Sequence, residues 1–87
     1  MMPEISRFLG IIISMNFRDH PPPHFHIRYN DYRATFSISE LRLLDGSLPP
    51  KVVPLVLEWA FAHRAELMIN WDLAIDKKPL NKIEPLV

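Results

Sequence analysis

Apolar and polar residues alternate without interruption along residues 24–29 and again along residues 32–38. A period of two is typical of β-strands that bury one of their two faces. Between these segments, Asn30 and Asp31 tolerate the left-handed backbone conformations that tight hairpin turns use. The pattern therefore predicts a β-hairpin with a two-residue turn.

The length of this turn also fixes the register of the two predicted strands. Counting outward from the turn, Phe25 faces Phe36 on one side of the hairpin, and Arg28 faces Arg33 on the other. In this register the apolar rows of the two strands coincide, and so do the polar rows. The agreement supports the hairpin independently of the alternation itself.

Two further segments have the composition of strands. In residues 10–17 an apolar row, Ile11, Ile13, Met15 and Phe17, alternates with Ile12, Ser14 and Asn16, which predicts a strand before the hairpin. Residues 18–23 then form a proline loop that separates this strand from the hairpin. Residues 40–44 are a candidate for a short fourth strand, and Asp45-Gly46 after them is a turn signal.

The second half of the chain has helical spacing. Apolar residues recur every three or four positions over residues 51–75, which predicts one long helix. Pro54 is tolerated only near the start of a helix, so the first turn must lie close to it. Residues 79–87 form an apolar tail after the helix. We expect residues 1–87 to be a single α+β domain, with three or four antiparallel strands and one long helix packed on one face.

Composition narrows the class of protein. The 87 residues are 48% hydrophobic and 23% charged with a formal net charge of zero, which is typical of one small globular domain. Zero net charge argues against coating nucleic acid by bulk charge, and it protects poorly against self-association into a homo-oligomer. The chain has no cysteine, no signal-peptide pattern and no apolar run of membrane-spanning length. We therefore expect a cytoplasmic protein that makes no membrane contact.

The most distinctive stretch combines histidine, proline and an acid. His20, His24 and His26 lie within seven residues, beside Asp19 and around the prolines at 21–23. Histidine binds metals and transfers protons near neutral pH, and proline stiffens the backbone while supplying no amide donor. The first interpretation is a metal site, in which the three imidazoles and the Asp19 carboxylate bind zinc or another divalent ion.

The second interpretation is acid–base catalysis on the polar face of the sheet. That face is expected to carry no acidic residue, and its members are Ser14, Asn16, His24, His26, Arg28, Arg33, Thr35 and Ser37. His24 and His26 would transfer protons, while Arg28 and Arg33 would bind the phosphate groups of RNA without a metal. Two arginines directly opposite each other are unfavourable unless they extend into solvent, pair with nearby acids or share an anion.

The third interpretation is structural. The imidazoles would then hydrogen-bond backbone carbonyls and hold the proline loop in place, and the protein would be a non-catalytic binding module. In that case Trp59, at the edge of the apolar helix stripe, and Ile83 and Leu86 in the tail are the candidates for contacting a partner protein.

The sequence resembles a small prokaryotic family, domain-of-unknown-function family 4160. The residues that carry the resemblance are Pro3 to Phe8, Gly10-Ile11, Asp19-His20-Pro21-Pro22, His24-Phe25-His26, Leu48-Pro49-Pro50, Trp59 and Asn70-Trp71, with Ile83 to Leu86 also similar. The resemblance implies genes that lie beside a second small gene, in pairs like toxin–antitoxin modules. It supplies no catalytic residues. We therefore expect a component of such a module, with RNA as the target and a small protein encoded nearby as the partner.

Overall fold

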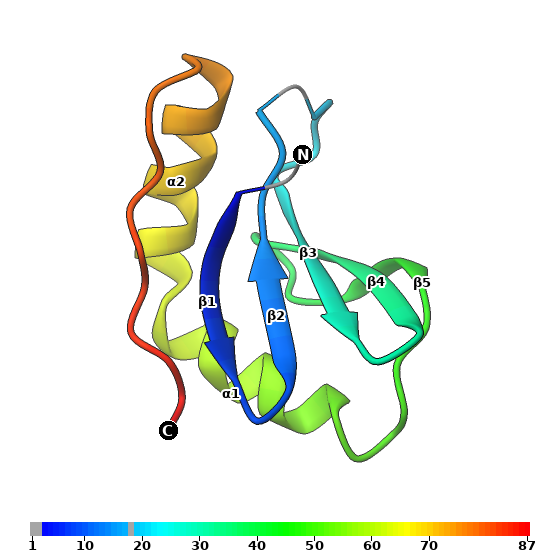
Figure 1. Ribbon diagram of the computed structural model, residues 1–87. Coiled ribbons are helices and arrows are strands. Elements are labelled where there is room, and N and C mark those ends of the chain that lie inside the picture. The colour runs from blue at the N-terminus through cyan, green and yellow to red at the C-terminus, as the bar shows by residue number, and fades with distance from the viewer. Residues whose placement is uncertain (1–2, 18) are drawn as a thin grey trace.

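The computed structural model describes residues 3–17 and 19–87, so Arg18, which begins the predicted proline loop, lies outside the described residues (Figure 1). The fold is α+β with a five-stranded antiparallel sheet in the order β1-β2-β3-β4-β5. The strands are β1 Glu4–Phe8, β2 Ile11–Ser14, β3 His24–Tyr29, β4 Tyr32–Ser37 and β5 Leu43–Gly46. The expectation of three or four strands is therefore wrong by at least one strand.

The strand that the sequence pattern did not predict is β1. Its pairing with β2 shifts register between Glu4 and Ser6, so a bulge interrupts the alternation. Ile5 and Phe8 are both buried although they are three positions apart. A period of two cannot be recognised across such a bulge in five residues, because the extra residue moves later side chains to the opposite face.

The predicted hairpin is confirmed in its register. Tyr29 pairs with Tyr32, Phe25 with Phe36 and Arg28 with Arg33. Asn30 adopts the left-handed conformation with φ of 52°. The neighbouring strands differ from their predicted limits: β2 ends at Ser14 rather than at residue 17, and β5 includes the predicted turn residues Asp45 and Gly46.

The predicted long helix is two helices, α1 Val53–Ala62 and α2 Arg64–Ile75. They are separated at His63, which has φ of −117° and ψ of 23°. Pro54 lies in the first turn of α1, as its missing amide donor requires. The break keeps the apolar spacing in phase, since Ala60 and Leu67 are both buried, seven residues apart. Periodicity alone could not have shown it.

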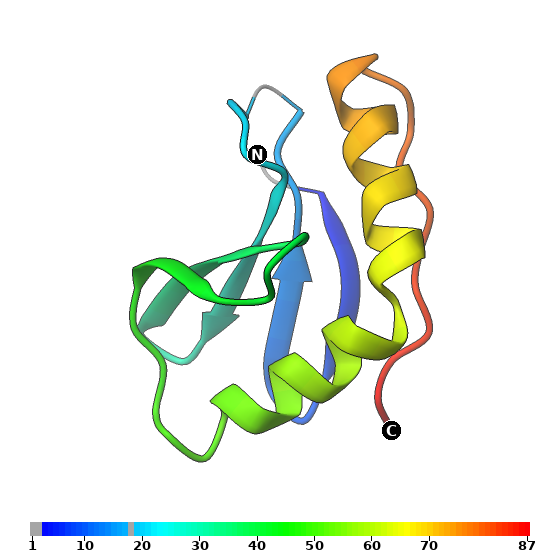
Figure 2. The same cartoon turned by 180° about the vertical axis from the view of Figure 1, so that it is seen from behind.

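Both helices cover the same face of the sheet, as the two opposite views show (Figures 1 and 2). Trp59 of α1 is fully buried. The centroid of its ring lies 5.8 Å from the ring centroid of Phe8 and 6.2 Å from that of Phe25. The core therefore lies between this face and the helices. Among the described helices, neither is long and apolar enough to cross a membrane.

The C-terminal tail packs between α2 and the outer edge of β1. The backbone amide of Ile83 donates to the carbonyl oxygen of Ile5 at 2.8 Å, and Ile83 is only 4% exposed. Asn70, buried on α2, donates from its side-chain amide to Asn81 O at 2.9 Å and accepts from the Asn81 backbone amide at 2.8 Å. One side chain thus satisfies the peptide groups of Asn81 as a neighbouring strand would.

Replacing Asn70 should therefore destabilise the protein more than replacing its partner. Asn70→Ala leaves both backbone groups of Asn81 unpaired and should lower the free energy of unfolding by about 1–3 kcal/mol. Asn81→Ala keeps the backbone groups and removes only an exposed side chain, so its effect should stay within about 0.5 kcal/mol. Urea denaturation measures both. Equal losses in the two variants would contradict this account of the tail.

Candidate functional site

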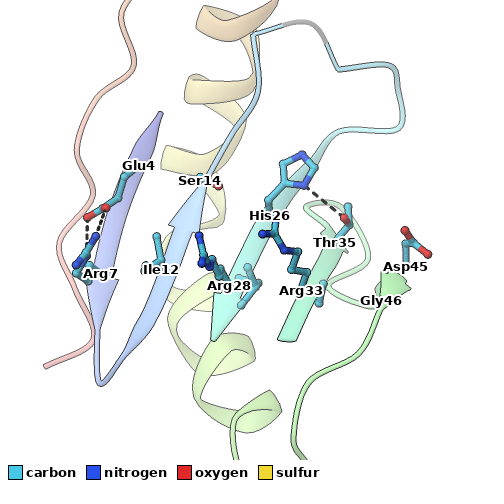
Figure 3. A pocket seen from close by; sticks show the side chains of 12 residues that line it. Glu4, Arg7, Ile12, Ser14, His26, Arg28, Arg33, Thr35, Asp45 and Gly46 are labelled. Carbon is cyan, nitrogen blue, oxygen red and sulfur yellow. Dashed lines mark hydrogen bonds and ion pairs between the residues drawn. The ribbon is translucent and has the colours of Figure 1, made fainter. Parts of the chain in front are cut away.

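The uncovered face of the sheet forms a groove of about 630 Å³, and Figure 3 shows the side chains that line it. Strand pairing arranges these side chains in two rows that run across the sheet. The first row is Glu4, Ser14, His26, Thr35 and Asp45, and the second is Arg7, Ile12, Arg28 and Arg33. The polar face that the alternation predicts is thus a concave surface with an acidic group at each end of its first row.

The prediction of an acid-free face is wrong because it lacked the outer strands. Glu4 comes from the unpredicted β1, and Asp45 was assigned to a turn rather than to β5. Three other predicted members do not line the groove. Asn16 follows the end of β2, Ser37 is 2% exposed, and His24 lies outside the lining. Ser14, His26, Arg28, Arg33 and Thr35 do line it.

The second row concentrates positive charge. The Arg7 guanidinium pairs with Glu4 at 2.7 Å, and this hydrogen bond lowers the pKa of the Glu4 carboxyl below its usual value. Arg28 and Arg33 are exposed, and neither forms an ion pair with any residue in the described part of the chain. Two directly opposed arginines without acidic partners favour an anion in the groove.

A cluster of two histidines and one aspartate adjoins the groove. Asp19 Oδ2 lies 2.7 Å from Nε2 of His26 and 3.0 Å from Nε2 of His24. The two rings are nearly perpendicular, with their centroids 5.1 Å apart. The side chains of Asp19, His24 and His26 are 18%, 12% and 22% exposed. His26 belongs to both features, because it also lines the groove.

Each ring has its other nitrogen directed at a protein oxygen. His24 Nδ1 lies 2.7 Å from the carbonyl oxygen of Pro22, and His26 Nδ1 lies 3.4 Å from the hydroxyl oxygen of Thr35. A carbonyl only accepts hydrogen bonds, so His24 Nδ1 carries a hydrogen. Nε2 of His24 and Nε2 of His26 both face the same carboxylate oxygen, Oδ2 of Asp19.

His20 is not part of this cluster. It is exposed on the loop, whereas the three atoms that could share an ion belong to Asp19, His24 and His26 and lie within 4.8 Å of one another. His20 was predicted to be a metal ligand only because of its spacing from His24 and His26 in the sequence. The contact of Trp71 with the cluster was not predicted: the centroid of its ring lies 5.1 Å from that of His24, so α2 packs against this side of the site.

The residues predicted to contact a partner protein are mostly in the interior. Trp59 is fully buried at the centre of the core, not at its edge, and its Nε1 donates to Glu84 O at 2.8 Å. Ile83 is buried against β1, and Leu86 is half-buried. The structure thus leaves Trp59 and Ile83 no exposed surface for a partner and gives both a role in packing the tail.

Fold and site together define a small α+β domain with a histidine–aspartate cluster beside a groove that is lined by three arginines and two acids, called the basic groove below. The sequence profile of a domain of unknown function, DUF4160, matches residues 10–72, and the chain belongs to this family. No curated protein and no solved structure matches the chain. The match runs from β2 into α2, and so includes the cluster and both Arg28 and Arg33.

Loss of the shared carboxylate should loosen the proline loop. In metal-free protein, Asp19→Ala removes the hydrogen bonds to both imidazoles and should lower the free energy of unfolding by about 1–3 kcal/mol. His20→Ala, in the same loop but outside the cluster, should change it by no more than about 0.5 kcal/mol. Chemical denaturation gives the energies. NMR spectra should show ring-proton shifts of His24 and His26 only in the Asp19 variant, and unchanged rings there would refute the arrangement.

Proposed function

We propose that this protein is a component of a two-gene module resembling a bacterial toxin–antitoxin pair, and that it acts on RNA through the basic groove. The observation that carries the RNA proposal is the opposed pair Arg28 and Arg33. The gene-pair proposal rests on the family resemblance and on no contact in the structure.

Phosphate is the anion that suits two adjacent guanidinium groups best. Each guanidinium presents several N–H donors in a plane and can bind two oxygens of one phosphate group. A phosphate between Arg28 and Arg33 also relieves the repulsion between like charges placed opposite each other on paired strands. Unlike Arg7, these two side chains need not give up an acidic partner first.

The acidic ends of the first row restrict what can bind. Glu4 and Asp45 border the groove, and the whole chain has zero net charge, so an extended duplex would meet repulsion beyond the central arginines. A volume of about 630 Å³ is that of a ligand pocket rather than of a long channel. A short single-stranded segment, with one or two phosphates on the arginines, fits these limits.

The cluster beside the arginines supplies the reactive groups. His26 lies two residues before Arg28 on β3, and both side chains line the groove. His24 does not line the groove, and its two ring nitrogens lie beside Pro22 O and Asp19 Oδ2, so it supports His26 and Asp19 rather than meeting the RNA directly. A phosphate held on Arg28 therefore lies next to the cluster, which is the arrangement that phosphodiester chemistry needs.

Removing the central arginines should weaken RNA binding specifically. Arg28→Ala and Arg33→Ala should each raise the dissociation constant for a short single-stranded RNA and reduce the dependence of log affinity on log salt by roughly 0.7 per lost phosphate contact. Arg42→Ala is the matched control, because Arg42 pairs with Glu40 outside the groove. Fluorescence anisotropy at several salt concentrations measures both quantities. RNA affinity equal to wild type in the double arginine variant would eliminate this groove as the RNA site.

The gene-pair proposal is tested by expressing this protein together with the product of the neighbouring gene. Co-expression should yield a stable complex of the two proteins in size-exclusion chromatography, and expression of each gene alone should show which product inhibits growth. Arg28→Ala/Arg33→Ala should abolish inhibition by this protein while the complex still forms. Two proteins that elute separately, with no effect of either on growth, would refute the gene-pair proposal but leave the RNA measurement standing.

A further inference from the structure

We propose that Asp19, His24 and His26 form a binding site for one divalent transition-metal ion, with zinc as the best match. One candidate ligand atom from each of the three residues lies within 4.8 Å of the others. We assign these atoms as Oδ2 of Asp19 and Nε2 of each histidine, because Oδ2 lies 3.0 Å from Nε2 of His24 and 2.7 Å from Nε2 of His26. This inference deepens the proposed function, because the ion would lie beside the phosphate site. The binding of the ion does not itself depend on RNA.

The distances from Asp19 Oδ2 to the two imidazole nitrogens are close to those in a metal site. Metal–ligand bonds of about 2.0–2.1 Å in a tetrahedral site place the ligand atoms roughly 3.3 Å apart. Asp19 Oδ2 now lies 3.0 Å from His24 Nε2 and 2.7 Å from His26 Nε2. Small rotations of the Asp19 carboxylate and of the two rings would open these two distances by about 0.3 and 0.6 Å, respectively, which partly exposed side chains allow.

The outer contacts orient both rings for coordination. His24 Nδ1 donates to Pro22 O at 2.7 Å, which leaves Nε2 as the nitrogen with a lone pair when the ring is neutral. Histidines that bind metals commonly donate their other nitrogen to a backbone carbonyl in this way. His26 Nδ1 faces the Thr35 hydroxyl, and Trp71 packs against the His24 ring. The carbonyl that orients His24 belongs to a run of three prolines, whose φ angles are fixed by their rings.

The donor set selects the class of metal. Two imidazole nitrogens and one carboxylate oxygen suit zinc and neighbouring transition metals, whereas magnesium and calcium prefer oxygen alone. Three protein ligands leave the fourth tetrahedral position open, as in catalytic rather than structural zinc sites. Because His26 also lines the groove, we assign the open position to a water molecule or to an oxygen of a phosphate on Arg28.

A divalent ion at this site would bind the Asp19 carboxylate and one unprotonated nitrogen of each imidazole. It would also add positive charge next to Arg28 and Arg33 and so strengthen the attraction for phosphate.

The test is a calorimetric titration of untagged, full-length protein, first freed of metal with a chelator. Zinc should bind at one site per chain, and magnesium at the same concentrations should produce no binding heat. Asp19→Ala, His24→Ala and His26→Ala should each weaken zinc binding at least by the roughly 10–100-fold that loss of a supporting contact costs. His20→Ala and His63→Ala remove histidines outside the cluster and should bind zinc as the wild type does.

A second measurement does not depend on how the variants fold. X-ray absorption of the wild-type zinc complex should show two imidazole ligands and a first shell of nitrogen and oxygen atoms only. A single imidazole, zinc binding that survives loss of His24 or His26, or no zinc binding by wild-type protein would each overturn the site. The Arg28→Ala/Arg33→Ala variant separates the two proposals, because it should lose RNA while keeping zinc. Wild-type protein that binds RNA but no zinc would refute the metal site alone.

Discussion

The helices cover only one face of the sheet, and the rest of the structure depends on this constraint. Trp59, with α1 and α2, buries the face that carries Phe25 and Ile27, so the alternating residues of the same strand must lie on the other side. His26 and Arg28 are therefore placed by the burial of their neighbours. A slip of one residue in β3 would move both into the core, which makes the position of the polar groups as strongly determined as the core itself.

The carboxylate of Asp19 connects the proline loop to this sheet. Pro21, Pro22 and Pro23 have no amide hydrogens to donate, so the loop depends on side chains and carbonyls for its polar contacts. The Asp19 carboxylate contacts the imidazoles of His24 and His26, which lie at the start of β3. The Pro22 carbonyl accepts a hydrogen bond from the His24 ring. The contacts that fix the loop are thus made by the groups that give the cluster its chemistry, and structural and functional interpretations of these histidines describe the same atoms.

The sequence predicts those parts of the molecule that local periodicity determines. The register of the β3–β4 hairpin followed from its turn, and with it the positions of His26 and Arg28. Periodicity failed where the backbone departs from regularity, at the bulge in β1 and at His63, where the helix break preserves the phase of the buried residues. It also placed Trp59 at the edge of a stripe, because it could not account for a tail that covers that side. Tertiary contacts, such as Trp71 against His24, had no local signal at all.

The attachment of the tail to β1 makes the topology of this small fold strongly non-local. Lys82 Nζ donates to the carbonyl oxygen of Glu4, which is 78 residues away in the sequence. The backbone amide of Ile83 donates to the carbonyl oxygen of the next residue, Ile5. Contacts of such long range carry a large loop-closure cost and slow folding relative to local helical or hairpin contacts. The β3–β4 hairpin needs no such closure. Ordering of the outer edge of the sheet would then be a late event, after the strands that carry His26 and Arg28 have already paired.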